Sequence, residues 1–99
     1  MAETPEKKVK KKVRALLDAL GAYYVMPVTG GYGTQGAPDF LVCLNGRFIG
    51  IEAKAGRGKT TTLQELNLKR IRDAKGVALV IYEKDLEDLK RLLYEVEIG

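Results

Sequence analysis

The sequence contains no histidine and only one cysteine, Cys43. Histidine is therefore excluded as a general base and as a metal ligand, and one chain cannot assemble the histidine and cysteine ligands of a closed zinc site. A disulfide within the chain is excluded as well, which suits a reducing compartment. We interpret Cys43 as a small buried apolar residue rather than a reactive thiol.

Long apolar runs are absent too. No stretch approaches the roughly 20 apolar residues that a membrane-spanning helix needs, and no apolar segment follows the basic N-terminus as in a signal peptide. The 99 residues are 45% apolar, which predicts one folded domain over residues 1–99, small enough to gain stability from a partner subunit. A net charge of +4 favours an anionic partner such as nucleic acid.

Periodicity and turn residues predict the order helix, three strands, helix, strand, helix. Thr4 and Pro5 are typical of a helix start, and Thr62-x-x-Glu65 resembles a capping box that begins the second helix. The segment 77–82 is continuously apolar, as in a strand buried on both faces. The predicted strands cover residues 22–28, 39–44, 47–54 and 77–82, and a glycine-rich loop covers 29–36.

A tight turn sets the register of the central hairpin. Asn45-Gly46 is a favoured two-residue turn, and it joins β-rich segments at 39–44 and 47–54. Because this turn pairs the residues that flank it, Asp39 is expected directly opposite Glu52. Side chains paired in this way have Cβ atoms about 4.5–5.5 Å apart.

The two faces of this hairpin differ in character. Lys54 and Gly50 alternate onto the face of Glu52, and the glycine is expected to leave open space beside the two acids. An ordinary surface hairpin with a charged face is the alternative. The opposite face predicts the core, because it carries only apolar side chains: Phe40, Val42, Ile49 and Ile51.

Two adjacent carboxylates and a lysine predict phosphate chemistry. Asp39 and Glu52 would repel each other, and a divalent cation would relieve that repulsion. Mg²⁺ binds one or two carboxylates and keeps waters for a substrate phosphate, whose developing charge Lys54 could stabilise. Glu6 falls in line with Val9 on the apolar stripe of the first helix, so it should be buried or paired. The alternative is a first-turn glutamate favoured by the helix dipole.

Two short motifs carry a resemblance to a known family: Gly36-Ala37-Pro38-Asp39 and Ile51-Glu52-Ala53-Lys54. The chain resembles the PD-(D/E)XK nuclease superfamily, and more narrowly the small stand-alone VRR-NUC nucleases of phages and bacteria. An early helix glutamate and the T-x-x-Q pattern at Thr61–Gln64 support it, and it covers about residues 5–83. It implies an α/β fold with a restriction-endonuclease-like αβββαβ(α) core, a mixed sheet flanked by helices.

The resemblance also implies roles for individual residues. The metal ligands would be Asp39, Glu52 and the Ala53 carbonyl, with Glu6 as a further acid; Lys54 would be catalytic, and Gln64 would orient substrate or water. The implied activity is Mg²⁺- or Mn²⁺-dependent hydrolysis of DNA that leaves a 5′-phosphate. Similar stand-alone proteins act as homodimers on branched DNA such as four-way junctions or flaps. The implied location is the cytoplasm of a bacterium or of a phage-infected cell.

Basic residues predict where DNA would bind. Arg57 and Lys59 flank the expected site in a flexible loop, and Lys8 and Lys12 lie on the polar side of the first helix. Tyr32 could stack on a base, although an ordinary packed loop tyrosine is the alternative. A solvated helix face is the corresponding alternative for the lysines. A binding module without catalysis therefore remains open, in which salt weakens binding and Mg²⁺ never produces a cut.

The segment from Ala53 to Thr60 leaves one more interpretation open. Its sequence A-K-A-G-R-G-K-T fits a permissive P-loop pattern between a strand and a helix, with alanine in place of the first glycine. The antiparallel hairpin immediately before it counts against a P-loop fold, which is built on a parallel sheet with crossover helices.

Overall fold

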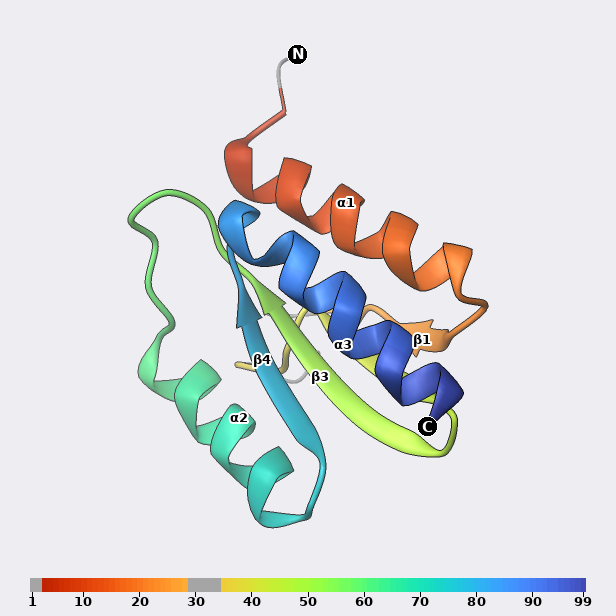
Figure 1. Cartoon of the computed structure of the whole chain (residues 1–99). Coiled ribbons are helices and arrows are strands. Elements are labelled where there is room, and N and C mark those ends of the chain that lie inside the picture. Colours follow the sequence, from red (N-terminus) through yellow and green to blue (C-terminus); the bar gives the residue numbers. More distant parts are fainter. Residues whose placement is uncertain (1–2, 29–34) are drawn as a thin grey trace.

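The computed structural model describes residues 3–28 and 35–99, and its elements follow the predicted order (Figure 1). The strand predicted at 22–28 is shorter than expected, and a 3₁₀ turn precedes the last helix. Among the described residues no helix combines the length and apolar character that a membrane crossing requires. The elements are α1 (Pro5–Ala19), β1 (Tyr23–Val25), β2 (Phe40–Leu44), β3 (Arg47–Ala53), α2 (Thr62–Asp73), β4 (Val77–Ile81), the 3₁₀ turn η1 (Glu83–Asp85) and α3 (Leu86–Ile98).

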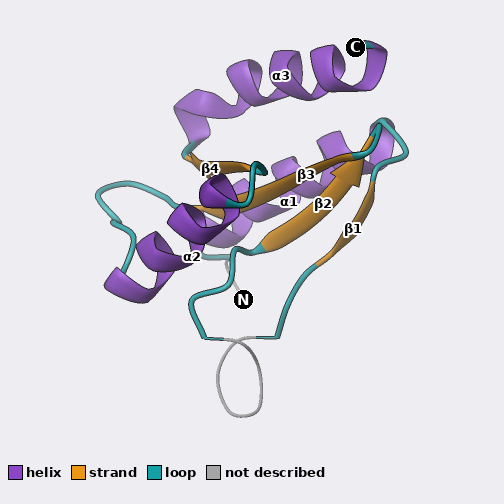
Figure 2. Ribbon diagram, turned by 90° about the horizontal axis from the view of Figure 1, so that it is seen from below, coloured by secondary structure: helices purple, strands orange, loops and turns teal. Residues whose placement is uncertain are grey.

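The strands form one mixed sheet in the order β1-β2-β3-β4. The first three strands are antiparallel neighbours, whereas β3 and β4 run parallel and are joined through α2. Helices α1 and α3 pack on one face of the sheet, and α2 packs on the other (Figure 2). The predicted mixed sheet flanked by helices is therefore confirmed.

The central hairpin has the predicted register. Leu44 pairs with Arg47, and Phe40 pairs with Ile51. The turn residues Asn45 and Gly46 have φ angles of 50° and 76°, the left-handed conformations that a tight hairpin turn of this type requires. This register brings the start of β2 beside the end of β3, where the acidic residues lie.

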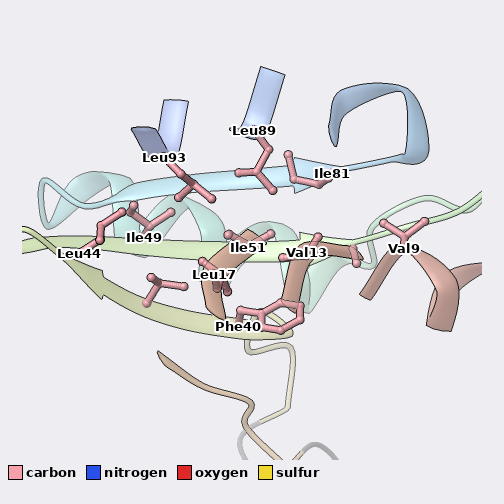
Figure 3. Packing of buried hydrophobic residues seen from close by; sticks show 12 residues of the cluster. Val9, Val13, Leu17, Phe40, Leu44, Ile49, Ile51, Ile81, Leu89 and Leu93 are labelled. Atoms are coloured by element: carbon pink, nitrogen blue, oxygen red, sulfur yellow. The ribbon is translucent and has the colours of Figure 1, made fainter. Parts of the chain in front are cut away.

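The core lies between this hairpin and the two helices on its predicted apolar face (Figure 3). Helix α1 contributes side chains at helical spacing, and burial of each stabilises the fold by about 1.5–3 kcal/mol relative to exposure. Because α1 is anchored in this way, its first turn is held against the end of the sheet that carries the acids. The core side chains include Val9, Val13, Leu17, Phe40, Val42, Ile49, Ile51, Leu89 and Leu93, each at most 3% exposed.

Three predictions about space and burial in the sheet are wrong. The space expected beside Gly50 is filled, since a Cβ there would lie 2.7 Å from the Ile71 side chain of α2 and 3.2 Å from Pro38. Strand β4 forms the edge of the sheet, so Val80 is only partly buried instead of covered on both faces. Cys43 is exposed, because it points away from the core on a part of the sheet face where its cross-strand neighbours are also exposed.

Candidate active site

A cavity of about 330 Å³ lies where four elements meet: the start of α1, the start of β2, the end of β3 and the start of α2. In Figure 1 the start of α1 and the loop between β3 and α2 lie at the same end of the sheet. A larger depression of about 460 Å³ lies beside Phe48 and Ile71, and none of the described residues that line it is acidic. The smaller cavity is lined by Glu6, Lys10, Gln35, Gly36, Ala37, Asp39, Glu52, Thr61, Leu63 and Gln64.

Asp39 is held in place by the backbone of the neighbouring strand. Its Oδ2 atom accepts a hydrogen bond of 2.8 Å from the backbone N–H of Ala53. Its Oδ1 atom lies 3.2 Å from the ammonium nitrogen of Lys10 on α1, and the side chain is 15% exposed. The hydrogen bond to Oδ2 therefore orients the Asp39 carboxylate, and Oδ1 faces the ammonium group of Lys10 at the cavity.

Glu52 is a buried acid with one uncompensated oxygen. The residue is 2% exposed, and its Oε2 atom accepts a 3.1 Å hydrogen bond from Gln64 and lies 3.6 Å from Lys54 Nζ. Its Oε1 atom is buried and has no hydrogen-bond partner within residues 3–28 and 35–99. Burial, and after it the nearby charge of Asp39, raises the pKa of the Glu52 carboxyl to about 7, against the opposing effect of Lys54. A buried oxygen in this state is a strong candidate for a cation ligand.

Lys54 follows directly after β3 and is fixed from two sides. Its backbone N–H donates a 2.9 Å hydrogen bond to the carbonyl of Ile81, which extends the pairing of β3 with β4 by one residue. Its side chain is 10% exposed and pairs with Glu52. The structure thus brings Asp39, Glu52 and Lys54 together on one patch, as the alternation along the hairpin predicted.

Gln64 links the start of α2 to the acids. The capping box was predicted at Thr62 and Glu65, but it is formed one residue earlier, by Thr61 and Gln64. Gln64 Oε1 accepts a 2.9 Å hydrogen bond from the Thr61 backbone N–H, so the amide nitrogen is left to donate to Glu52. The helix cap therefore orients the Gln64 amide toward the site.

Glu6 and the predicted DNA-contact residues are less constrained. Glu6 lines the cavity, with its side chain 44% exposed and 3.9 Å from Lys10, so it is paired but not buried. The apolar stripe of α1 continues beyond the core to the open cavity, which explains why the Glu6 side chain on this stripe is exposed. The DNA-contact predictions stay untested: Arg57, Lys59 and Lys8 are exposed, Lys12 is exposed and pairs with Glu83, and Tyr32 lies outside the described residues.

Lys10 is the site residue that sequence reasoning assigned no individual role. The first helix carries several other lysines, and its charge pattern alone does not separate Lys10 from them. A usable signal was its position four residues after Glu6, which places both side chains on the same part of the helix surface.

Gly36 allows the loop before β2 to approach α2 closely. Its φ is +78°, and an added Cβ would lie 2.8 Å from the backbone carbon of Leu63. Gly46 has a similar φ of +76°, but within the part of the chain that the structure describes nothing lies within 4 Å of a Cβ there. Comparing substitutions at Gly36 and Gly46 therefore distinguishes the cost of backbone strain, which both share, from the cost of a steric clash, which only Gly36 has.

We expect Gly36→Ala to reduce the free energy of unfolding by about 2–4 kcal/mol, and Gly46→Ala by about 1 kcal/mol, because only the first adds a clash with backbone. Urea unfolding of both variants measures the difference. Equal losses would show that the close approach of Gly36 to α2 contributes nothing to stability.

Two carboxylates of this site are candidate ligands for a hard divalent cation. Among the described residues, no group of three acidic or thiol side chains converges closely enough to enclose a metal ion. Asp39 and Glu52 do converge. The buried Oε1 atom of Glu52 accepts no hydrogen bond from any of those residues. Mg²⁺ usually needs only one or two carboxylates and fills its other positions with water and substrate. The residues present therefore fit such an ion.

The P-loop interpretation finds little support in this geometry. Helix α2 begins at Thr62, after the cap residue Thr61, so Lys59 lies in the loop and not at the first turn of a helix. The strand before the loop is the second strand of an antiparallel hairpin. Neither feature matches a loop that cradles phosphates at a helix start.

The fold and the acidic cavity define the chain as a nuclease-like α/β domain. No family model and no curated protein matches the sequence. A solved structure described as a "VRR_NUC domain" is similar, with 28% sequence identity, a TM-score of 0.74, and coverage of 88% of this chain and 95% of that chain. The chain thus has the VRR-NUC fold, which confirms the restriction-endonuclease-like core predicted from its motifs.

Proposed function

We propose that this protein is a metal-dependent endonuclease that hydrolyses phosphodiester bonds in branched DNA. The observation that carries the proposal is the buried Glu52 Oε1 atom, unpaired among the described residues, beside Asp39 and Lys54 at the edge of an open cavity. A structural ion pair would satisfy both oxygens of a buried carboxylate. A site that keeps one oxygen free is suited to a ligand that arrives from solution.

The metal would be held by Asp39, Glu52 and the Ala53 carbonyl, with Glu6 at the cavity wall as a further acid. When bound, Mg²⁺ or Mn²⁺ supplies a Lewis acid that polarises a phosphate and makes a coordinated water more acidic. Asp39 is suited to this role because the Ala53 N–H fixes its orientation. The Gln64 amide fixes Glu52 in the same way.

Lys54 would stabilise the transition state. Its ammonium group is largely removed from solvent, so its interaction with negative charge building on the phosphoryl oxygens is screened less than at the surface. Pairing with Glu52 holds the ammonium group of Lys54 beside that acid. The lysine would also help to orient the attacking water.

DNA would approach over the loop between β3 and α2. Arg57 and Lys59 are exposed in this loop, which leads to Thr61 at the cavity wall, and Lys8 is exposed on α1. These side chains would contact phosphates, which positions the duplex without reading its sequence.

Branched DNA as the substrate and a homodimer as the active form rest on the likeness to stand-alone VRR-NUC nucleases. Cutting two strands symmetrically needs two active sites, and a C₂ dimer provides them. Light scattering on the active protein tests the assembly, and a stable monomer with full activity would contradict the dimer.

The activity is tested with labelled four-way junction, flap and duplex DNA in the presence of Mg²⁺ or Mn²⁺. We expect cleavage of branched substrates that stops in EDTA. Asp39→Asn should abolish cleavage, because asparagine can still accept the Ala53 hydrogen bond but carries no charge for the metal. Asp73→Asn, at an exposed position on α2, is the matched control and should cut normally. Salt-sensitive DNA binding without any cut would favour a non-catalytic binding module.

A further inference from the structure

Lys10 turns toward the acids, unlike its neighbours on α1. Its ammonium nitrogen lies 3.2 Å from Asp39 Oδ1, and the side chain is 31% exposed. Lys11 pairs instead with Glu3 near the N-terminus, and Lys12 pairs with Glu83 after β4. The positive charge of Lys10 is therefore directed into the cavity by the rotation of the helix.

The atom that Lys10 contacts is the oxygen that a metal would use. Asp39 Oδ2 already accepts the hydrogen bond from Ala53 N–H, which leaves Oδ1 as the oxygen of Asp39 available to a cation. Lys10 Nζ lies within ion-pair distance of that oxygen. A divalent cation bound to Oδ1 would meet the ammonium group at close range, and two cations there repel each other.

We propose that Lys10 is a built-in competitor of the divalent cation for Asp39. In the metal-free protein it neutralises Asp39, and it must leave Oδ1 when the ion binds. Glu6 Oε2 lies 3.9 Å from Lys10 Nζ and offers the ammonium a second partner at the cavity wall. The displaced lysine stays at the cavity, where its ammonium group can donate a hydrogen bond to a phosphate of the substrate. This inference rests on the proposed metal site.

The test is Mn²⁺ binding to the 99-residue chain without DNA, measured from the free Mn²⁺ signal in electron paramagnetic resonance. A cation next to a carboxylate shifts the affinity of that carboxylate for protons by about tenfold or more, and partial exposure reduces the effect. We therefore expect Lys10→Met to lower the dissociation constant of Mn²⁺ by about tenfold. Lys10→Gln should give the same change with a polar side chain, and Lys10→Arg, which keeps the charge, should bind as wild type.

Lys11→Met is the matched control, because it removes the same charge from the same helix at a residue paired with Glu3. Its dissociation constant should change less than about twofold, since exposed charges at a distance are screened. Equal tightening in Lys11→Met and Lys10→Met would overturn the inference, because net charge alone would then explain it. Unchanged or weaker binding in Lys10→Met and Lys10→Gln would overturn it as well.

Asp39→Asn separates this inference from the proposed function. If Mn²⁺ binds to wild type and is lost in Asp39→Asn, while Lys10→Met binds as wild type, the metal site stands and the competition by Lys10 is overturned. If Mn²⁺ binds to neither wild type nor any Lys10 variant, the metal site and the competition are both overturned. Tighter binding in Lys10→Met that disappears when Asp39→Asn is added supports both.

Discussion

Replacing Lys54 with alanine or methionine should reduce DNA cleavage by about a hundred- to a thousandfold, the usual effect of removing one group that stabilises developing charge. DNA binding should change little, because the Lys54 side chain is 10% exposed and offers little surface to a duplex. Single-turnover cleavage of a labelled junction measures the rate, and a binding titration in Ca²⁺ measures affinity. Full activity in either variant would remove the proposed role of Lys54.

Loss of Lys54 also affects the fold, because it leaves the buried Glu52 carboxylate without its ion-pair partner. We therefore expect Lys54→Met to unfold at lower urea than wild type at pH 8. Adding Glu52→Gln removes the buried charge, so the double variant should regain stability while remaining inactive. Because Glu52→Gln is itself expected to be inactive, the double variant tests stability only, and a double variant as unstable as Lys54→Met would show that the buried Glu52 charge is not the cause of the loss.

Lys75→Met is the control for this experiment. Lys75 lies between α2 and β4, beside the start of the parallel pairing and at the opposite end of the sheet from the acids. The substitution Lys75→Met removes one lysine charge at a residue that does not line the cavity, so both cleavage and stability should stay close to wild type.

Removing the charge of Glu52 should stabilise the metal-free protein above neutral pH. The pKa of the folded carboxyl is raised from 4.5 to about 7, chiefly by burial. Between these values the folded state binds a proton that the unfolded state has lost, so stability falls as the pH rises through this window. Once ionised, Glu52 lowers the free energy of unfolding by about 3 kcal/mol.

We expect Glu52→Gln to be more stable than wild type by about 3 kcal/mol at pH 8 and nearly equal to it at pH 4.5. The attraction between Lys54 and ionised Glu52 is already included in this value, because it opposes the rise in the pKa of Glu52. Urea unfolding in EDTA between pH 4.5 and 8 measures it. The same decline with pH in both proteins would show that Glu52 is not the titrating group.

Two comparisons sharpen this measurement. Glu65→Gln removes the same charge from an exposed position on α2, and it should leave the decline between pH 4.5 and 7 in place. Mg²⁺ should restore stability to wild type at pH 8 and have little effect on Glu52→Gln, because the cation compensates the charge that the variant lacks. Glu52→Gln is expected to be more stable but inactive. Burial of the Glu52 carboxylate therefore lowers the stability of the metal-free protein and at the same time provides a ligand for a cation.

Much of the central site could be predicted from the sequence because it depends on local geometry. The Asn45-Gly46 turn determines which residues pair, and alternation along a strand then places Asp39, Glu52 and Lys54 on one face. The apolar face of the same hairpin is equally local, since Phe40 and its neighbours alternate with the charged positions. These features need only the bonding geometry of two adjacent strands.

The rest of the site depends on where the helices pack. The contact of Lys10 with Asp39 joins α1 to β2, and the contact of Gln64 with Glu52 joins α2 to β3. The filled space beside Gly50 arises in the same way, from a side chain of α2. Periodicity identifies the face of a helix that is buried, but it does not specify the position of that helix along the sheet.

The sequence alone thus determined the pairing of the two acids, the position of the lysine beside them and the order of the elements, because hydrogen-bonded strands and a two-residue turn leave little choice. Only the tertiary structure decided that Glu52 is buried with a raised pKa, that Lys10 forms an ion pair with Asp39, and that an open cavity borders these residues. Those properties come from long-range packing of α1 and α2 against the sheet, which controls solvent access and charge together.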